Sequence, residues 1–250
     1  MAETITLTIQ RFDPSVDNEP YYKDYEVPND DPDFAPFTAL KALHYVNRYF
    51  EPIGYDYNCR RDSCGRCAMM IDGQPHLACG FVLSSTHTLE PLKGFPIIRD
   101  LVVDKKDAYA KFVGGSSSIK TLDPETVTKS FDDGSLWLDK IYSINACREC
   151  MSCYGICSAL QINGKWDSFA GPGATMQVYM RSIDTMDHDD RVSQAVFAQN
   201  IFECIQCGLC NTVCPAGIPI QENIKELMDK AEARGLKPET DSDTTYWPLL

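Results

Sequence analysis

Twelve cysteines constrain this chain of 250 residues more than any other feature, because they form three tight groups of four. The groups are Cys59, Cys64, Cys67 and Cys79; Cys147, Cys150, Cys153 and Cys157; and Cys204, Cys207, Cys210 and Cys214. Disulfide scaffolds are usually much shorter chains with cysteines spread along them. Residues 1–9 show no basic leader and no continuous apolar run, so we expect no export signal. The grouping therefore favours metal-binding thiolates over disulfides.

The first group has the spacing C-x4-C-x2-C-x11-C, and its first three cysteines match the plant-type [2Fe–2S] pattern. Gly65 lies inside the motif, where the missing Cβ lets backbone N–H groups approach the sulfurs. Positive charge from Arg60, Arg61 and Arg66 would favour the reduced cluster; the alternative is that these side chains only form a solvated loop surface. Zinc also takes four thiolates, but zinc ribbons pair two C-x2-C units. The spacing therefore predicts a [2Fe–2S] site at Cys59, Cys64, Cys67 and Cys79.

The second and third groups share the spacing C-x2-C-x2-C-x3-C, and a proline follows the second copy. This is the run of two-cluster bacterial ferredoxins, in which the fourth cysteine of each run binds the other cluster. Three cysteines on a tight turn hold one face of a cubane, so the fourth ligand comes from across it. The rule predicts a [4Fe–4S] site at Cys147, Cys150, Cys153 and Cys214. It assigns the third cluster to Cys157, Cys204 and Cys210, with Cys207 available as a fourth ligand.

Outside the cysteines, we find no pattern of residues that indicates substrate chemistry. The four histidines have no spacing that pairs them with a cysteine group, so structural roles are favoured for His44, His76, His87 and His188. No glycine-rich phosphate loop opens a helix, and residues 171–173 are interpreted as a turn. A chain with cluster sites and no catalytic residues is expected to pass electrons between partners.

The charge and hydropathy of the chain exclude two classes of partner. The formal net charge of −13 argues against nucleic-acid binding, which needs a basic surface, and against charge-driven docking to anionic lipid. No uncharged apolar run of about 18 residues is present, so no segment is expected to cross a bilayer by itself. Hydrophobic residues make up 44% of the chain, which is enough for a packed core.

Hydrophobic periodicity predicts a small mixed sheet with one crossing helix in the first hundred residues. Strands are expected at 5–9, 22–27, 68–71, 76–79, 88–92 and 97–103, with Asp72-Gly73 as a hairpin turn. Thr38 is the expected cap of a helix over 39–50, whose buried stripe would be Leu40, Leu43, Val46 and Phe50. Beyond the turn-rich stretch 114–118, helices are expected at 136–144, 192–204 and 220–234.

The order of these motifs resembles the iron–sulfur subunit of the succinate dehydrogenase and fumarate reductase family. The resemblance covers nearly the whole chain. Two short motifs separate the [2Fe–2S] loop from the two ferredoxin runs: Leu-Glu-Pro-Leu at 89–92 and Ile-Arg-Asp-Leu-Val-Val-Asp at 98–104. The second ferredoxin run ends at Cys214-Pro215. The implied fold is α+β, with a β-grasp [2Fe–2S] ferredoxin-like domain at 1–105, a linker at 106–135, and an all-α helical ferredoxin domain with two cubane-type clusters at 136–250.

The resemblance also implies a function in a quinol:fumarate reductase or succinate:quinone oxidoreductase complex. This chain would be its electron-transfer subunit, with no catalytic residues of its own. One partner would be a flavoprotein with covalent FAD that interconverts succinate and fumarate. The other would be a membrane anchor that binds quinone and haem b. We expect the chain at the cytoplasmic face of the cell membrane, held by the anchor, in anaerobic respiration or the tricarboxylic acid cycle.

Two departures from the family pattern bear on function. Most members hold [3Fe–4S] as the third cluster and lack cysteine at the position of Cys207. The number of cysteine ligands here favours a second [4Fe–4S], whereas the usual cluster of the family favours [3Fe–4S]. Many succinate-oxidising members carry a quinone-contacting Trp shortly after the cysteine matching Cys157; residues 158–164 have none, and Trp166 is offset. This favours a menaquinone-linked fumarate reductase over a succinate dehydrogenase. The alternatives are a soluble multi-cluster ferredoxin and a subunit of a complex that acts on thiols or a heterodisulfide.

Overall fold

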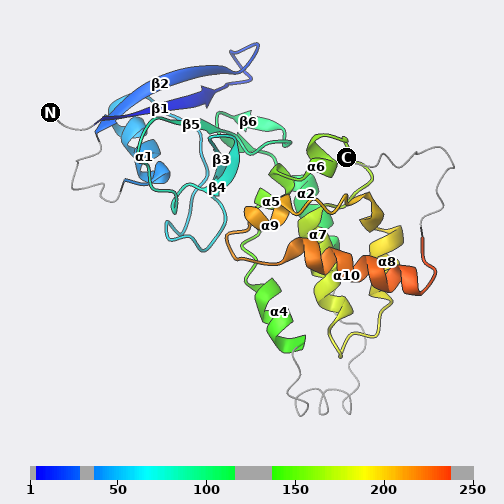
Figure 1. The fold of residues 1–250 in the computed structure, drawn as a ribbon. Helices are drawn as coiled ribbons and strands as arrows, with labels where there is room; N and C mark the ends of the chain where they lie inside the picture. Colours follow the sequence, from blue (N-terminus) through cyan, green and yellow to red (C-terminus); the bar gives the residue numbers. More distant parts are fainter. Residues whose placement is uncertain (1–3, 29–36, 116–136, 238–250) are drawn as a thin grey trace.

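The structure is a computed structural model that describes residues 4–28, 37–115 and 137–237. Figure 1 shows a β-sheet with one helix in the N-terminal part and a group of helices in the C-terminal part. The strands are β1 (Thr4–Arg11), β2 (Tyr21–Pro28), β3 (Ala68–Ile71), β4 (Gln74–Leu77), β5 (His87–Glu90), β6 (Ile97–Arg99) and β7 (Val102–Val103). The longer helices are α1 (Ala39–Tyr49), α2 (Lys106–Gly115), α4 (Trp137–Asn145), α7 (Pro172–Ser182), α8 (Arg191–Phe197) and α10 (Ile220–Ala233). Single turns form α5 (Ser152–Gly155), α6 (Ser158–Gln161), η1 (Ile201–Glu203) and α9 (Leu209–Thr212).

Five strands of the N-terminal part form one sheet in the order β2-β1-β5-β3-β4. β1 pairs antiparallel with β2 and parallel with β5. β3 pairs antiparallel with both β4 and β5. Together with the crossing helix α1, this is the β-grasp arrangement that the resemblance implied, so the predicted α+β fold is confirmed.

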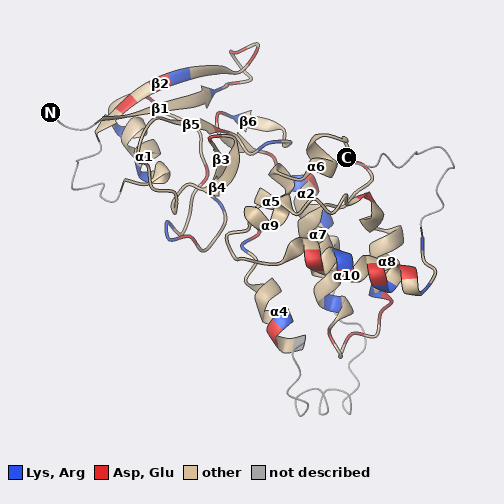
Figure 2. Cartoon of the chain, viewed as in Figure 1, with Lys and Arg blue, Asp and Glu red and all other residues tan. Residues whose placement is uncertain are grey.

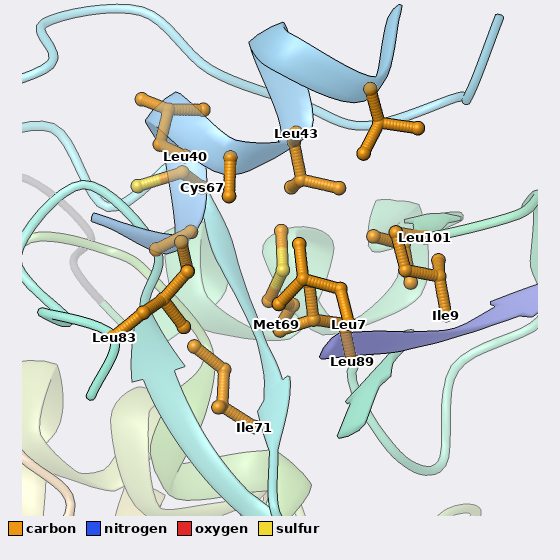
Figure 3. Packing of buried hydrophobic residues seen from close by; sticks show 14 of the residues in the cluster. Leu7, Ile9, Leu40, Leu43, Cys67, Met69, Ile71, Leu83, Leu89 and Leu101 are labelled. Atoms are coloured by element: carbon orange, nitrogen blue, oxygen red, sulfur yellow. The ribbon is translucent and has the colours of Figure 1, made fainter. Parts of the chain in front are cut away.

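The core of this domain lies between the sheet and α1 (Figure 3). Leu40 and Leu43 of α1 lie over Leu7, Met69 and Leu89 of the sheet. All five side chains are buried, because the apolar stripe of the helix and the inner face of the sheet can be removed from water only against each other. The thiol of Cys67 belongs to the same buried cluster, so one cysteine of the first group is held by the core itself.

The hairpin between β3 and β4 brings Cys79 next to the other cysteines of its group. Asp72 and Gly73 have φ angles of 51° and 76°, the left-handed pair that a two-residue hairpin turn requires. The returning strand ends where the N–H of Ala78 donates to the carbonyl of Cys67 at 3.0 Å. The predicted Asp72-Gly73 turn is therefore present, and it delivers Cys79 to the edge of the core.

Helix α7 is the centre of the C-terminal part, and each of its first nine residues is buried. Met176, Val178 and Tyr179 pack with Ile224 and Leu227 of α10 in one cluster. Figure 2 colours residues of both charge signs on α4 and α10, as expected of helices with one face towards solvent. In the part of the chain that is described, no helix is long and apolar enough to cross a membrane.

Five expectations differ from the structure. The strand expected at 97–103 instead turns back on itself as β6 and β7, which pair antiparallel on either side of Asp100 at a φ of 46°. Residues 106–115 of the expected linker form α2, because Ala108 and Phe112 are buried on α7; residues 116–136 lie outside the described ranges. The helix expected at 192–204 breaks into α8 and η1, because Asn200 has a φ of 51°. The turn expected at 171–173 starts α7, with Pro172 at its first position. Phe50 ends α1 and is 52% exposed, so it lies outside the buried stripe.

A buried ion pair joins the first strand to the β6–β7 ribbon. Arg11 Nε donates to Asp100 at 2.9 Å, and the two side chains are 10% and 4% exposed. Asp100 also accepts from the backbone N–H groups of Phe12 at 3.0 Å and Gly54 at 2.8 Å. This one carboxylate therefore holds β1, the start of the cysteine loop and the ribbon together.

Asp100→Ala is expected to destabilise the protein by about 3 kcal/mol, because it leaves a buried guanidinium and two backbone N–H groups without this carboxylate. Arg99→Ala is the control, because Arg99 is 59% exposed where it pairs with Asp13, and such pairs contribute less than about 1 kcal/mol. Chemical unfolding of the two variants beside the parent checks the difference. Equal midpoints for all three proteins would contradict the role of Asp100.

Candidate functional site

The first cysteine group converges at the loop between α1 and β3. The N–H groups of Cys59 and Cys64 each donate to the sulfur of the other, at 3.4 and 3.3 Å. The N–H of Asp62 donates to the sulfur of Cys79 at 3.1 Å, which draws this cysteine to the same loop. Cys67 interacts electrostatically with both Cys64 and Cys79. The structure therefore brings together all four cysteines predicted for the [2Fe–2S] site.

The backbone of this loop points N–H groups inwards. Arg60, Asp62 and Gly65 have φ angles of 59°, 54° and 69°, and left-handed residues alternating with others form concave nests of N–H groups. The N–H groups of Arg61 and Ser63 donate to the sulfur of Cys59 at 3.5 and 3.3 Å. These bonds lower the pKa of the Cys59 thiol to about 6. The loop thus stabilises negative charge on sulfur, which is what thiolate ligands of an anionic cluster need.

The second site contains three cysteines of one run and the last cysteine of the other. Cys147, Cys150, Cys153 and Cys214 line one small cavity together with apolar side chains of Phe112, Met151, Met176, Ile218 and Ile220. Glu149 and Met151 have φ angles of 51° and 65°, which curl the 147–153 segment around this cavity. Burial raises the pKa of Cys147 to about 11, and the thiols of Cys150 and Cys214 act in the same direction.

The third site has the reciprocal composition. Burial raises the pKa of Cys157 to about 11, with smaller contributions from the nearby thiols of Cys204 and Cys207. Burial likewise raises the pKa of Cys210 to about 12, and Cys204, Cys157 and Cys207 again contribute. Cys207 is exposed, and its thiol donates to the Ser158 hydroxyl at 3.7 Å. The exchange of Cys157 and Cys214 between the two runs is thus visible in the arrangement of the side chains.

The three sites lie in a row through the molecule. Cys67 of the first site and Cys150 of the second belong to one buried cluster of side chains. Cys153 of the second site interacts electrostatically with Cys210 of the third. Figure 1 shows α5 and α9, the single turns that follow Cys150 and Cys207, side by side at the junction of the two domains, and both are in contact.

The donor sets fit iron–sulfur clusters. Each site gathers four thiols; apolar side chains line the second site, and inward N–H groups bond the sulfurs of the first, which is the environment that such clusters require. Within the described ranges, no three His, Cys, Asp or Glu side chains are close enough to hold a single metal ion. Ligand sulfurs of a cluster stand farther apart, because iron and sulfide occupy the space between them. Six of these thiols have a raised pKa, so binding of clusters to their thiolates would release protons.

The remaining residues singled out in the sequence lie outside the three sites or at their edges. His44 contacts the Tyr55 hydroxyl at 2.7 Å, and His87 contacts Asp72 at 2.6 Å. Trp166 stacks on the buried Tyr154 with ring centroids 6.3 Å apart and packs against Phe95. Each of these side chains therefore has a packing role in the fold.

The arginines of the first loop are exposed, and two of them lie on aromatic rings. Arg60 is 5.1 Å from the centroid of the Tyr57 ring, and Arg66 is 6.0 Å from that of Tyr109. Two further basic residues lie near the first two sites, and no sequence pattern predicted their positions there. Arg148 pairs with Asp62 at 2.8 Å across the junction, and Lys105 interacts electrostatically with both Cys67 and Cys150. Only the folded chain brings these charges together.

Two family models match the chain in the order of the sites. A 2Fe-2S iron-sulfur cluster binding domain matches residues 6–110, and a 4Fe-4S dicluster domain matches residues 143–218. The chain is also similar to the structure of the Mycobacterium smegmatis Sdh1 complex in the apo form, with a TM-score of 0.81 and 24% identity over 96% of this chain and 100% of that one. That likeness shows a shared fold.

Relatives by sequence fall in two groups. An uncharacterized iron-sulfur protein of Methanocaldococcus jannaschii is 32% identical over 92% of this chain, which spans 44% of that protein's length. The fumarate reductase iron-sulfur subunit of Escherichia coli O157:H7 is 32% identical over 86% of this chain and 88% of the relative. The corresponding subunit of Haemophilus influenzae is 30% identical over 84% and 86%. The chain therefore belongs to the family of fumarate reductase iron–sulfur subunits.

Proposed function

We propose that this chain carries electrons between a flavoprotein with covalent FAD and a membrane partner that binds quinol, in the direction of fumarate reduction. The balanced reaction oxidises quinol to quinone and reduces fumarate to succinate, with two electrons and two protons passing from one to the other. The observation that carries the proposal is the row of three all-cysteine sites, joined by Cys67 with Cys150 and by Cys153 with Cys210. Bound clusters supply the one-electron carriers, and the residues of this chain hold and insulate them.

The proposed ligand sets follow the three sites. [2Fe–2S] is held by Cys59, Cys64, Cys67 and Cys79; the first [4Fe–4S] by Cys147, Cys150, Cys153 and Cys214; and the third cluster by Cys157, Cys204, Cys207 and Cys210. The second of these sets lines one cavity, and in the third the thiols of Cys204 and Cys207 raise the pKa of both Cys157 and Cys210. The order of the sites suggests that the flavoprotein docks near the first and the quinone-binding anchor, with its haem b, near the third.

The direction of electron flow is proposed from the sequence around the third site. Residues 158–164 contain no Trp, and Trp166 is packed between Phe95 and Tyr154. The positions where the succinate-oxidising members carry a quinone-contacting Trp therefore hold none here, which supports the direction of fumarate reduction. The relatives with fumarate reductase names support the same direction.

The experiment is to isolate the native complex through a tag on this chain and assay it in both directions. We expect a co-purifying subunit with covalent flavin, and faster fumarate reduction with a reduced menaquinone analogue than succinate oxidation with the quinone. Faster succinate oxidation would reverse the proposed direction. A lone species of 28.0 kDa carrying all its clusters would instead support the soluble ferredoxin alternative.

We further propose that the third cluster is a second [4Fe–4S], with Cys207 as its fourth ligand. Three observations support this assignment: the Cys207 thiol interacts with Cys157 and Cys210, its loop curls around the site through Gln206 and Gly208 at φ angles of 57° and 76°, and the matching family model is a 4Fe-4S dicluster domain. Loss of one ligand from such a site removes one iron and leaves [3Fe–4S].

Cys207→Ala is therefore expected to convert the third cluster into [3Fe–4S]. The oxidised variant should show the near-isotropic EPR signal of that cluster, stoichiometric with protein, whereas the oxidised parent protein should not. Ser158→Ala is the control, because it removes the hydrogen-bond partner of Cys207 and no ligand. A strong [3Fe–4S] signal already present in the anaerobically isolated parent, unchanged in Cys207→Ala, would contradict the assignment.

A further inference from the structure

Lys105 places a basic group at the junction of the first two sites. Its backbone carbonyl accepts from the N–H of Tyr109 at 2.9 Å, which fixes the residue at the entrance of α2. Its side chain is half-buried, whereas that of Lys106, the next residue, is exposed. Two consecutive lysines thus have different surroundings, and only the first is turned towards the interior.

The charged groups that face Lys105 come from both sites. It interacts electrostatically with Asp56, Cys150, Arg66 and Cys67, in decreasing order. Burial lowers the pKa of Lys105, while Asp56 and the two cysteines act in the opposite direction. Among the described residues, no carboxylate lies within 4.0 Å of the Lys105 ammonium as an ion-pair partner. Its charge is therefore not neutralised by a close ion pair there.

The junction around Lys105 is closely packed. A Cβ on Gly65 would lie 2.1 Å from the Arg148 carbonyl oxygen and 2.8 Å from Cys150 Cβ, so the two cysteine loops touch through their backbones. The Tyr109 hydroxyl donates to the Glu149 carbonyl at 3.0 Å, and Arg148 pairs with Asp62 at 2.8 Å. Water is poorly able to screen a charge in such a packed region, so a cation there acts on both sites.

We propose that Lys105 sets the reduction potentials of the first two clusters together, by stabilising the added electron on each. The inference rests on the proposed ligand sets, because it needs clusters at Cys67 and Cys150. An iron–sulfur cluster becomes more negative when reduced, so a nearby fixed cation raises its potential. A cation shared by two neighbouring clusters moves both potentials in the same direction and leaves the third unchanged, since none of its cysteines is among the groups that act most strongly on Lys105.

The test is an EPR-monitored redox titration of the holoprotein with Lys105 replaced. In Lys105→Met we expect the reduction equilibrium constants of the [2Fe–2S] and first [4Fe–4S] clusters to fall about tenfold, which is about 59 mV for a one-electron couple. The third cluster should not change. Lys105→Arg keeps the charge and should keep the parent potentials. Lys106→Met is the matched control, because it removes an exposed lysine one residue away and should leave all three potentials as they are.

Four outcomes overturn the inference: unchanged potentials in Lys105→Met, a shift confined to one of the first two clusters, equal shifts of all three clusters, or the same shift in Lys106→Met. Lys105→Gln, with a neutral polar head, gives the same readout if methionine lowers the cluster content. An error in the proposed ligand sets can be told apart from an error in the role of Lys105. In that case the parent protein itself, before any substitution, would lack a [2Fe–2S] or a [4Fe–4S] signal.

Discussion

The double variant Cys147→Ala, Cys214→Ala is expected to lose one cluster, about four irons per protein, although it removes a cysteine from each run. The reason is the exchange of fourth cysteines: both residues line the same cavity and are proposed as ligands of the same [4Fe–4S]. The [2Fe–2S] and third clusters should remain. Iron analysis, with EPR spectra of the reduced and oxidised protein, provides the measurement. Electron transfer through the complex should be abolished, because the middle carrier of the row is missing.

The matched control is Cys147→Ala, Cys157→Ala, which removes two cysteines from one run. It takes one ligand from each cubane, because Cys157 faces Cys204 and Cys210 of the other run, so it is expected to convert both into [3Fe–4S] and to lose about two irons per protein. If each run bound its own cluster, the two double variants would exchange their results. This comparison does not depend on telling the spectra of the two cubanes apart.

Gly65→Ala is expected to have the largest effect of any glycine-to-alanine change at the glycines that the structure describes. The new Cβ would lie 2.1 Å from the Arg148 carbonyl oxygen and 2.8 Å from Cys150 Cβ, at a φ of 69°. Both neighbours belong to the ligand loop of the second site, so relief of the overlap must move one cysteine loop away from the other. We expect destabilisation by more than about 5 kcal/mol, with loss of the [2Fe–2S] signal and poor recovery of holoprotein.

Gly73→Ala separates the overlap from the cost of the backbone conformation. Gly73 has a similar φ of 76°, but a Cβ there would meet nothing within 4 Å. The control should therefore cost only about 1–2 kcal/mol for the left-handed conformation and keep all its clusters. Thermal unfolding and visible absorption of the two variants check the contrast. A Gly65→Ala protein as stable as Gly73→Ala would show that the two loops do not need their close contact.

The sequence predicted the elements that local rules control. Alternation in β1, the Thr38 cap and the Asp72-Gly73 turn each depend on a few neighbouring residues, and all three are present. The helices at α4 and α10 were also predicted to within one or two residues. Helix α2 was missed, because its apolar face is too short to be recognised in the sequence. Ala108 and Phe112 are buried only because α2 packs on α7 in the folded chain. The break between α8 and η1 was missed, because left-handed Asn200 carries no strong sequence signal.

For the sites, the spacing of the twelve cysteines alone determined their division into three groups and the exchange predicted between the second and third. Spacing is sufficient because a cluster imposes its own geometry on cysteines that are close in sequence. Only the tertiary structure decided how the sites adjoin: Gly65 lies against Cys150, Arg148 pairs with Asp62, and Lys105 is brought close enough to interact electrostatically with both Cys67 and Cys150. These contacts join residues about 40 to 90 positions apart, and they arise from the packing of one domain on the other, which no local pattern encodes.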